Sequence, residues 1–243
     1  MMQDTAWLSR TTLLIGEAQL QKLTNSHVLV VGMGGVGSFA AEFICRSGIG
    51  EMTIVDGDVV DPSNRNRQLP ALATTHGQSK ALLMAERLRA INPELKLHVV
   101  KEFIRPEAVA DILSGSFDYI VDAIDSISPK LTFMKAAYAK GAPLISSMGA
   151  GGRMDPTQLR IADISKTYNC PFAQQIRKQL KKEGIYKGIK VVFSPEEPLK
   201  ESLMMTDGAN FKKSAYGTMS YLPATFGATA ASVVIRDLMS AGG

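Results

Sequence analysis

The chain has 243 residues, of which 45% are hydrophobic and 21% are charged. A chain of this length and composition can bury a large core without disulfides or a structural metal, which excludes a disordered tail protein. The 27 Lys and Arg residues exceed the 23 Asp and Glu residues by a formal charge of +4, a balance that by itself does not distinguish a nucleic-acid binder from an ordinary enzyme.

The cysteines and the apolar segments bear on the compartment. Cys45 and Cys170 are too few for a disulfide framework or a four-thiolate zinc site, and they suit a reducing environment. The chain starts without the basic and apolar segments of a secretion signal, and no apolar run reaches the roughly 18 residues of a membrane span. We therefore expect a cytoplasmic protein of one domain, residues 1–243, without stable membrane insertion.

The first part of the chain alternates short apolar runs with helical segments. Strands are predicted at 27–31, 52–55, 97–100, 119–121 and 144–146, and helices at 38–45 and 78–92. Such strands, separated by segments long enough for crossover helices, are typical of a parallel sheet covered by helices. The sequence therefore predicts an α/β fold with a Rossmann-like, mostly parallel sheet and helices on both faces.

Beyond residue 152 this alternation stops, and prolines interrupt the chain repeatedly. We expect irregular or antiparallel additions in this C-terminal part. Helices are predicted there at 172–183 and at 224–239, the second with small residues that allow close packing. No internal repeat or low-complexity linker divides the chain.

A glycine-rich segment, Gly-Met-Gly-Gly-Val-Gly at 32–37, lies between the first predicted strand and the helix that starts at Ser38. Gly32, Gly34, Gly35 and Gly37 allow backbone N–H groups to approach a phosphate at a helix N-terminus. Asp56 ends the second strand, where a carboxylate can accept hydrogen bonds from a ribose. The alternative interpretation is a tight turn that binds no ligand. A ribose contact does not distinguish a dinucleotide from ATP, because both contain that ribose.

Several residues suited to binding further phosphates favour ATP over a dinucleotide. The segment Asn-Arg-Asn-Arg-Gln at 64–68 is rich in donors, and Arg67 can hold a polyphosphate through two hydrogen bonds. Lys80 starts a predicted helix, where a cation is unfavourable unless it faces an anion. Asp125 follows a strand end, where a carboxylate can hold Mg²⁺. Taken singly, Lys80 and Asp125 fit surface charges better, and only their joint placement indicates a site.

Taken in order, these motifs resemble those of the HesA/MoeB/ThiF family, which is related to the ubiquitin-activating enzymes. The resemblance implies an ATP-dependent adenylyltransferase that activates a carboxylate, usually as a homodimer. The residues that carry it are Gly32, Gly34, Gly35, Gly37, Ser38, Asp56, Asp58, Asn64, Asn66, Arg67, Gln68, Lys80, Asp122 and Asp125. By position, Asp56 would hold the ribose, Arg67 and Lys80 the phosphates and Asp125 the magnesium, while Arg10 would reach into the neighbouring subunit's site.

The C-terminal part narrows the resemblance to one branch. Segments 147–158 and 162–167 resemble the tRNA-modifying branch of the family, which uses ATP to close the threonylcarbamoyl side chain of adenosine 37 into a cyclic form. The paired Cys-x-x-Cys motifs common in members that activate sulfur carriers or ubiquitin-like proteins are absent from this sequence. Two alternatives stay open, an adenylyltransferase for such a carrier protein and a nucleotide-binding partner in sulfur relay without turnover. A monovalent cation and a sulfur-transfer protein are kept as further candidate ligands.

A basic segment is the predicted tRNA contact. Residues 166–190 contain seven basic residues and one acidic residue, a net charge of +6. Arg177, Lys178, Lys181 and Lys182 are its central members, and Lys212 and Lys213 would extend it. Neutralisation of phosphates by such a segment gives salt-dependent RNA binding. The alternative is an ordinary solvated helix face.

The remaining reactive side chains receive structural interpretations. Cys170 precedes a predicted helix, where a thiol can accept sulfur. The alternative, which we favour, is a loop cysteine that contributes only packing contacts. Cys45 is expected in the core. His27, His76 and His98 show no metal-ligand spacing and are interpreted as structural.

Overall fold

A computed structural model describes residues 6–205 and 214–240. Its centre is a seven-stranded sheet with the order β3-β2-β1-β4-β5-β7-β6. The pairs from β3 through to β7 are parallel, and β6 alone runs antiparallel, beside β7. The strands are β1 (His27–Val31), β2 (Glu51–Val55), β3 (Lys96–Val100), β4 (Tyr119–Asp122), β5 (Leu144–Ser147), β6 (Arg160–Asp163) and β7 (Lys190–Phe193).

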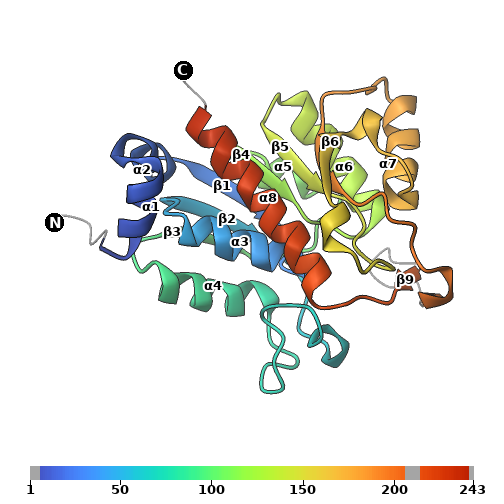
Figure 1. Ribbon diagram of the computed structural model, residues 1–243, viewed down its shortest axis with the longest axis horizontal. Coiled ribbons are helices and arrows are strands. Elements are labelled where there is room, and N and C mark those ends of the chain that lie inside the picture. Colours follow the sequence, from blue (N-terminus) through green and yellow to red (C-terminus); the bar gives the residue numbers. More distant parts are fainter. Residues whose placement is uncertain (1–5, 206–213, 241–243) are drawn as a thin grey trace.

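Helices cover both faces of this sheet (Figure 1). Alternation along β1 explains the two layers, because Val28 and Val30 enter one core cluster while Leu29 and Val31 enter the other. The first cluster is completed by α2 (Glu17–Thr24), α3 (Gly37–Arg46), α4 (Lys80–Ile91) and α8 (Tyr221–Ser240), the second by α5 (Val109–Ile112), α6 (Ile127–Ala139) and α7 (Pro171–Lys182). The predicted α/β class with helices on both faces is confirmed.

The long helix α8 packs directly on α3, as its small residues predict (Figure 1). A Cβ atom added at Gly227 would lie 2.4 Å from the carbonyl oxygen of Val36. Only glycine allows the two backbones to approach this closely. This contact fixes the start of α3, and therefore the glycine-rich turn before it, against the C-terminal part of the chain.

Most predicted boundaries agree with the structure, although the sequence did not predict strand β7. The C-terminal part does contain antiparallel additions, namely β6 and a hairpin of β8 (Leu203–Met205) and β9 (Ser214–Tyr216). However, β7 joins the main sheet parallel to β5. The shorter elements are η1 (Ala6–Leu8), α1 (Ser9–Ile15), η2 (Pro62–Asn64), η3 (Pro156–Gln158), η4 (Ile164–Lys166) and η5 (Lys200–Ser202). Among the described helices, none has the length and apolar character that crossing a bilayer requires.

Strand pairing also brings two of the histidines together. The rings of His27 on β1 and His98 on β3 lie 5.6 Å apart between centroids, on either side of Glu51 on β2. Their distance in sequence hides this proximity, because parallel strands separated by long crossovers bring distant residues to one edge. The structure therefore shows a proximity of His27 and His98 that their spacing in the sequence does not indicate.

Candidate nucleotide-binding site

The candidate site lies where the direction of the strand order changes. The chain runs outward from β1 to β2 and β3 on one side, and from β4 onward on the other. In open α/β sheets, ligands bind beyond the carboxyl ends of the strands at this switch point. The carboxyl ends of β1 and β4 are in close contact, since a Cβ atom at Gly32 would lie 2.9 Å from the carbonyl oxygen of Ala123. The glycine-rich turn and the Asp122–Asp125 segment therefore share one edge.

Two glycines of the turn are sterically required. Gly32 has φ +92°, and a Cβ atom at Gly37 would lie 1.7 Å from the Gly32 carbonyl oxygen. The turn therefore leads directly into the N-terminus of α3, which carries partial positive charge. Ser38 is fully buried, and its hydroxyl donates a 2.5 Å hydrogen bond to the carbonyl oxygen of Gly34. The Ser38 side chain thus shapes the turn from the protein side.

Asp56 connects this turn to the end of β2. One carboxylate oxygen accepts the backbone N–H of Met33 at 2.6 Å, and the other accepts that of Asp58 at 2.7 Å. Burial raises the pKa of Asp56, while Lys80 and the two backbone donors act in the opposite direction. The carboxylate is held rigidly at the place where the sequence predicts a ribose contact, and each oxygen keeps a second acceptor site.

Lys80 is not a surface charge. It is only 5% exposed, and its ammonium lies 3.1 Å from a carboxylate oxygen of Asp58. The backbone N–H of Lys80 also bonds to the carbonyl oxygen of Asp58, so the first turn of α4 is joined to the end of β2. This pairing explains how a cation is tolerated at a helix N-terminus, and it places the ammonium beside Asp56.

The donor-rich segment forms a short ordered loop. The Arg67 guanidinium donates to the carbonyl oxygen of Ser63 at 3.0 Å and to the amide oxygen of Asn66 at 2.9 Å. Burial lowers the pKa of Arg67, and the charge of Asp125 raises it, which places both charges within electrostatic reach of each other. Asn66 also donates to the carbonyl oxygen of Thr218. Asn64 is buried and caps this loop by accepting the backbone N–H of Asp61.

One buried polar atom beside the glycine turn is compatible with a ligand. The Gln68 side-chain oxygen is buried, and the described part of the chain offers it no hydrogen-bond donor. This side chain faces Gly34, because a Cβ atom at Gly34 would lie 3.8 Å from the Gln68 amide nitrogen. A buried acceptor without a partner carries a free-energy cost that a ligand donor can remove. The glycine turn and Gln68 therefore suit a nucleotide that brings its own donors.

A buried ion pair supports the segment after β4, and sequence reasoning missed its cation. Asp122 accepts the ammonium of Lys130 at 2.8 Å and the hydroxyl of Ser146 at 2.7 Å. Lys130 also donates to the carbonyl oxygen of Ile124, and burial lowers its pKa. The carboxylate of Asp125 is exposed at the end of this segment. A lysine within the apolar run 127–139 was the available signal.

Arg10 lies outside this site within one chain. It is exposed on α1, which follows Leu8, and Leu8 packs near Gly48 just after the C-terminus of α3. The glycine turn instead precedes the N-terminus of α3. Figure 1 shows α1 and α7 at opposite ends of the molecule. A single chain therefore does not bring Arg10 to the predicted phosphate residues.

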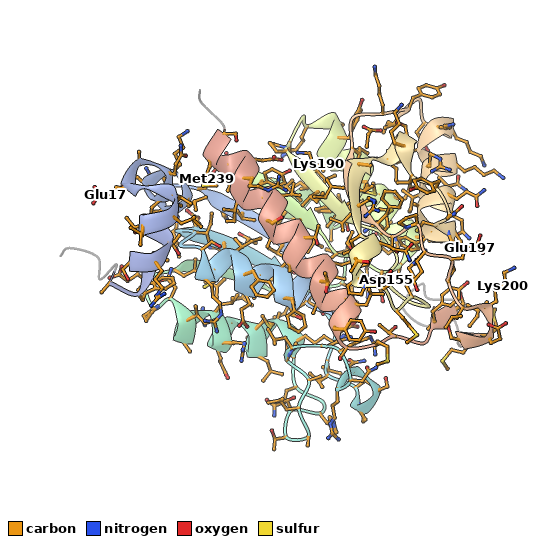
Figure 2. The ribbon with its side chains drawn as sticks, in the orientation of Figure 1. Glu17, Asp155, Lys190, Glu197, Lys200 and Met239 are labelled. Atoms are coloured by element: carbon orange, nitrogen blue, oxygen red, sulfur yellow. The ribbon has the colours of Figure 1, made fainter. Side chains whose placement is uncertain are left out.

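The basic segment is smaller than the sequence predicts. Arg177 is half-buried and donates to both the carbonyl and the hydroxyl oxygen of Thr167, so its guanidinium already has partners within the protein. Lys190 lies beside α8 (Figure 2), where its ammonium pairs with Asp237. Arg177 therefore has an internal partner that the sequence does not show, and its contact with tRNA stays a prediction. Lys178, Lys181 and Lys182 are exposed on α7, whereas Lys212 and Lys213 lie outside the described residues.

Both cysteines are buried. Burial raises the pKa of the Cys45 thiol to about 12, as expected for a core cysteine. Cys170 occupies the N-cap position of α7 but is 3% exposed and belongs to the core cluster on that face. The packing interpretation of Cys170 is thereby favoured over a sulfur-accepting one, which needs an accessible thiolate.

Comparisons with known proteins agree with this geometry. The sequence profile of the ThiF family matches residues 8–242. The tRNA threonylcarbamoyladenosine dehydratase of Bacillus subtilis is 43% identical over 95% of this chain and 94% of its own length. The crystal structure of the Escherichia coli tRNA N6-threonylcarbamoyladenosine dehydratase, TcdA, in complex with ATP matches with a TM-score of 0.88 at 37% identity, covering 99% of this chain and 97% of that chain. Its complex with AMP matches with a TM-score of 0.87 at 38% identity, over 99% of this chain and 98% of that chain.

Proposed function

Because this chain belongs to the ThiF family, we propose that it uses ATP to dehydrate threonylcarbamoyladenosine 37 of tRNA to a cyclic form through adenylation of the carboxylate. The observation that carries the proposal is the placement of the turn 32–37, Arg67, Lys80 and Asp125 around the switch point of the sheet. Support comes from the Bacillus subtilis relative of similar length and from the ATP complex of the Escherichia coli dehydratase. We propose that residues 1–243 act as one adenylation domain.

The nucleotide is proposed to lie against the turn 32–37, with its phosphates at the N-terminus of α3. Gly34 and Gly35 would present backbone N–H groups there, and Asp56 would accept the ribose hydroxyls. Gln68, Asn66 and Asp58 would contact the nucleotide, whereas Asn64 and Ser38 would act by holding their loops, because both side chains are buried. The buried oxygen of Gln68 supports a ligand donor at this place.

Arg67 and Lys80 are proposed to bind the phosphates, and Asp125 to bind Mg²⁺. When bound, Mg²⁺ supplies positive charge that screens the phosphates of ATP from an approaching carboxylate. Lys80 already sits in an acidic environment made by Asp56 and Asp58, which keeps its ammonium in place. Arg67 has hydrogen bonds to Ser63 and Asn66 that orient its guanidinium plane. These fixed charges would stabilise the negative charge that develops at the α-phosphate.

The chemistry needs no nucleophile from the protein. A free carboxylate is inert because hydroxide or oxide is a poor leaving group. Attack of the substrate carboxylate on the α-phosphate of ATP forms an acyl adenylate and releases pyrophosphate. The carbamoyl group of the same substrate then attacks the acyl carbon and loses a proton to solvent, and AMP leaves with one of the original carboxylate oxygens. Because the two reacting groups belong to one molecule, orientation in the site can supply much of the rate.

The tRNA is proposed to contact the exposed lysines of α7. Lys178, Lys181 and Lys182 are exposed there, and long side chains project outward from this helix in Figure 2. Ile176 and Leu180 are buried on the opposite side of the helix, so the apolar face is occupied and the basic face is left for a polyanion. Because Arg177 and Lys190 have internal partners, the proposed contact relies on fewer charges than the sequence predicts.

We propose that the active species is a homodimer. Leu13 and Leu14 on α1 are 89% and 85% exposed, which is unusual for adjacent leucines on one helix. A second copy of the chain that covers them would also supply Arg10 from the same helix to the neighbouring site. A cytoplasmic location is proposed because tRNA and reduced thiols are found there. A sulfur-transfer protein stays a candidate partner, and because both cysteines are buried it would not act through a thiol of this chain.

The proposal is tested with the purified chain, ATP, Mg²⁺ and tRNA that carries threonylcarbamoyladenosine. After digestion to nucleosides, mass spectrometry should show the loss of one water from the modified nucleoside, only when ATP is present. An unchanged nucleoside, with ATP binding verified on the same preparation, would contradict the proposed function. ATP–pyrophosphate exchange stimulated by a small protein ending in Gly-Gly, and not by tRNA, would indicate a carrier-protein adenylyltransferase instead.

A further inference from the structure

We propose that His27, Glu51 and His98 form a binding site for one transition-metal ion of the Zn²⁺ class. The three side chains come from β1, β2 and β3, and each offers a ligand atom within 4.8 Å of the other two. His27 and Glu51 are the first residues of their strands, so the cluster lies at the amino edge of the sheet. The nucleotide site lies at the carboxyl edge, so the two sites are separate.

The contacts around Glu51 already resemble a ligand arrangement. The ring nitrogen Nε2 of His98 lies 2.8 Å from Oε1 of Glu51, and Nδ1 of His27 lies 3.6 Å from the same oxygen. Ligands of a tetrahedral zinc ion lie about 2 Å from the metal and hence roughly 3 to 4 Å from each other. Small side-chain rotations, with no change of the backbone, would therefore let all three atoms surround one ion.

The backbone and one further hydrogen bond preorganise the cluster. His27 pairs with Glu51 across β1 and β2, and Thr53 pairs with His98 across β2 and β3. The second ring nitrogen of His27, Nε2, lies 2.8 Å from the hydroxyl of Thr53. Such a partner fixes the ring orientation and leaves Nδ1 directed at Glu51, as outer-shell partners of metal-binding histidines do.

The charges nearby are compatible with a metal. Burial lowers the pKa of His27, with Glu51 and the backbone of Ser116 raising it and His98 and Lys96 lowering it, and a lowered pKa favours the neutral ring that binds metals. Lys96 also binds Oε1 of Glu51, at 2.9 Å, and would have to leave. Its side chain is 66% exposed and can move into solvent. A divalent ion would then take over the interaction that Lys96 makes with the carboxylate.

The donor set decides the class of metal. Two imidazole nitrogens and one carboxylate oxygen suit Zn²⁺ and its neighbours, whereas Mg²⁺ and Ca²⁺ prefer oxygen ligands alone. The side chain of His98 is 46% exposed, which gives an ion access and leaves a coordination position for water. Because the ligands come from three strands, the ion would join them and stabilise the folded chain over the unfolded one.

The test uses the full chain without a histidine tag, stripped of metal with EDTA and titrated with ZnCl₂ by calorimetry in excess Mg²⁺. We expect one high-affinity Zn²⁺ per chain. His98→Ala should weaken binding by at least roughly tenfold. His76→Ala is the matched control, because His76 is exposed and lies outside the cluster, and it should bind as the unmodified chain does.

Two further measurements keep the outcome clear. Zn²⁺ should raise the Tm of the unmodified chain and of His76→Ala but not that of His98→Ala, and circular dichroism checks that each variant is folded. If His98→Ala does not fold, the nearly isosteric Glu51→Gln replaces it, with the same expected loss. Absence of Zn²⁺ binding to the unmodified chain, or equal binding to the variant and the control, would overturn the proposal.

Discussion

The ammonium of Lys130 lies 2.8 Å from a carboxylate oxygen of Asp122, and neither side chain has solvent-exposed surface. Lys130 also bonds to the carbonyl oxygen of Ile124, while Asp122 accepts the Ile124 backbone N–H. The ion pair therefore binds both the carbonyl oxygen and the backbone N–H of Ile124, in the segment that carries Asp125. In this way an ion pair in the core controls the position of an exposed carboxylate at the nucleotide site.

Replacing Lys130 with Met should lower the free energy of unfolding by about 3 kcal/mol, because the Asp122 carboxylate is left buried without its cation. Chemical denaturation measures the change. The double variant Asp122→Asn with Lys130→Met should recover part of the loss, since no buried charge then remains. Lys178→Met, on the exposed face of α7, is the control and should change stability by less than about 0.5 kcal/mol. A Lys130 variant as stable as this control would contradict the assignment.

Arg67→Ala should reduce kcat by at least about 100-fold, because it removes a fixed cation from the proposed phosphate site. The fold should survive, since Arg67 is a loop residue whose guanidinium donates to Ser63 and Asn66 of the same loop. Turnover is measured by the nucleoside mass assay and folding by circular dichroism. Arg89→Ala, on the exposed face of α4, controls for loss of a positive charge. Full activity of Arg67→Ala would remove Arg67 from the phosphate site.

Lys181→Glu combined with Lys182→Glu should weaken tRNA binding and reduce the slope of log K against log salt by roughly 1 to 2, because about two phosphate contacts are lost. Filter binding over a salt series measures both quantities. Arg89→Glu with Arg236→Glu makes the same change of net charge on surfaces outside α7. Equal effects of the two double variants would indicate that Lys181 and Lys182 form an ordinary solvated helix face and do not contact tRNA.

The proposed dimer predicts complementation between two inactive variants. Arg10→Ala and Arg67→Ala should each be inactive alone, but a mixed dimer has one site with both arginines intact. After equal amounts are mixed and allowed to exchange subunits, about a quarter of the unmodified activity should return, since half of the dimers are mixed and each has one complete site. Sedimentation should show dimers that become monomers in Leu13→Lys with Leu14→Lys. No recovery after verified exchange would place Arg10 outside the partner's site.

The sheet and the glycine turn could be predicted from the sequence because their signals are local. The apolar runs at 27–31 and 119–121 are strands in the structure, and Gly32 and Gly37 stand where the backbone leaves no room for a side chain. In contrast, β7 was not predicted as a strand. Its apolar run has only three residues, Val191 to Phe193, which is a weak local signal for a strand. Its pairing with β5 depends on tertiary packing, which the sequence does not show.

The residues that each side chain contacts could not be predicted from the sequence. Lys80 was read as a surface charge when taken alone, yet its ammonium is buried against Asp58. Arg177 was predicted to contact RNA, and the sequence does not show that its guanidinium also donates to Thr167, because the chain before α7 folds back onto the helix. Lys130, His27 and His98 interact with residues on other strands and helices. Their roles could not be predicted, because the sequence does not show which elements become neighbours.

The central claim is that the substrate carboxylate attacks the α-phosphate of ATP, and an isotope experiment tests it most directly. The tRNA substrate is prepared with ¹⁸O in the threonine carboxylate, and the reaction is run with ATP and Mg²⁺. Because AMP leaves with one carboxylate oxygen, mass spectrometry should find one ¹⁸O atom in AMP and none in pyrophosphate. Formation of ADP with ¹⁸O in inorganic phosphate, or a cyclised product with unlabelled AMP, would contradict adenylation.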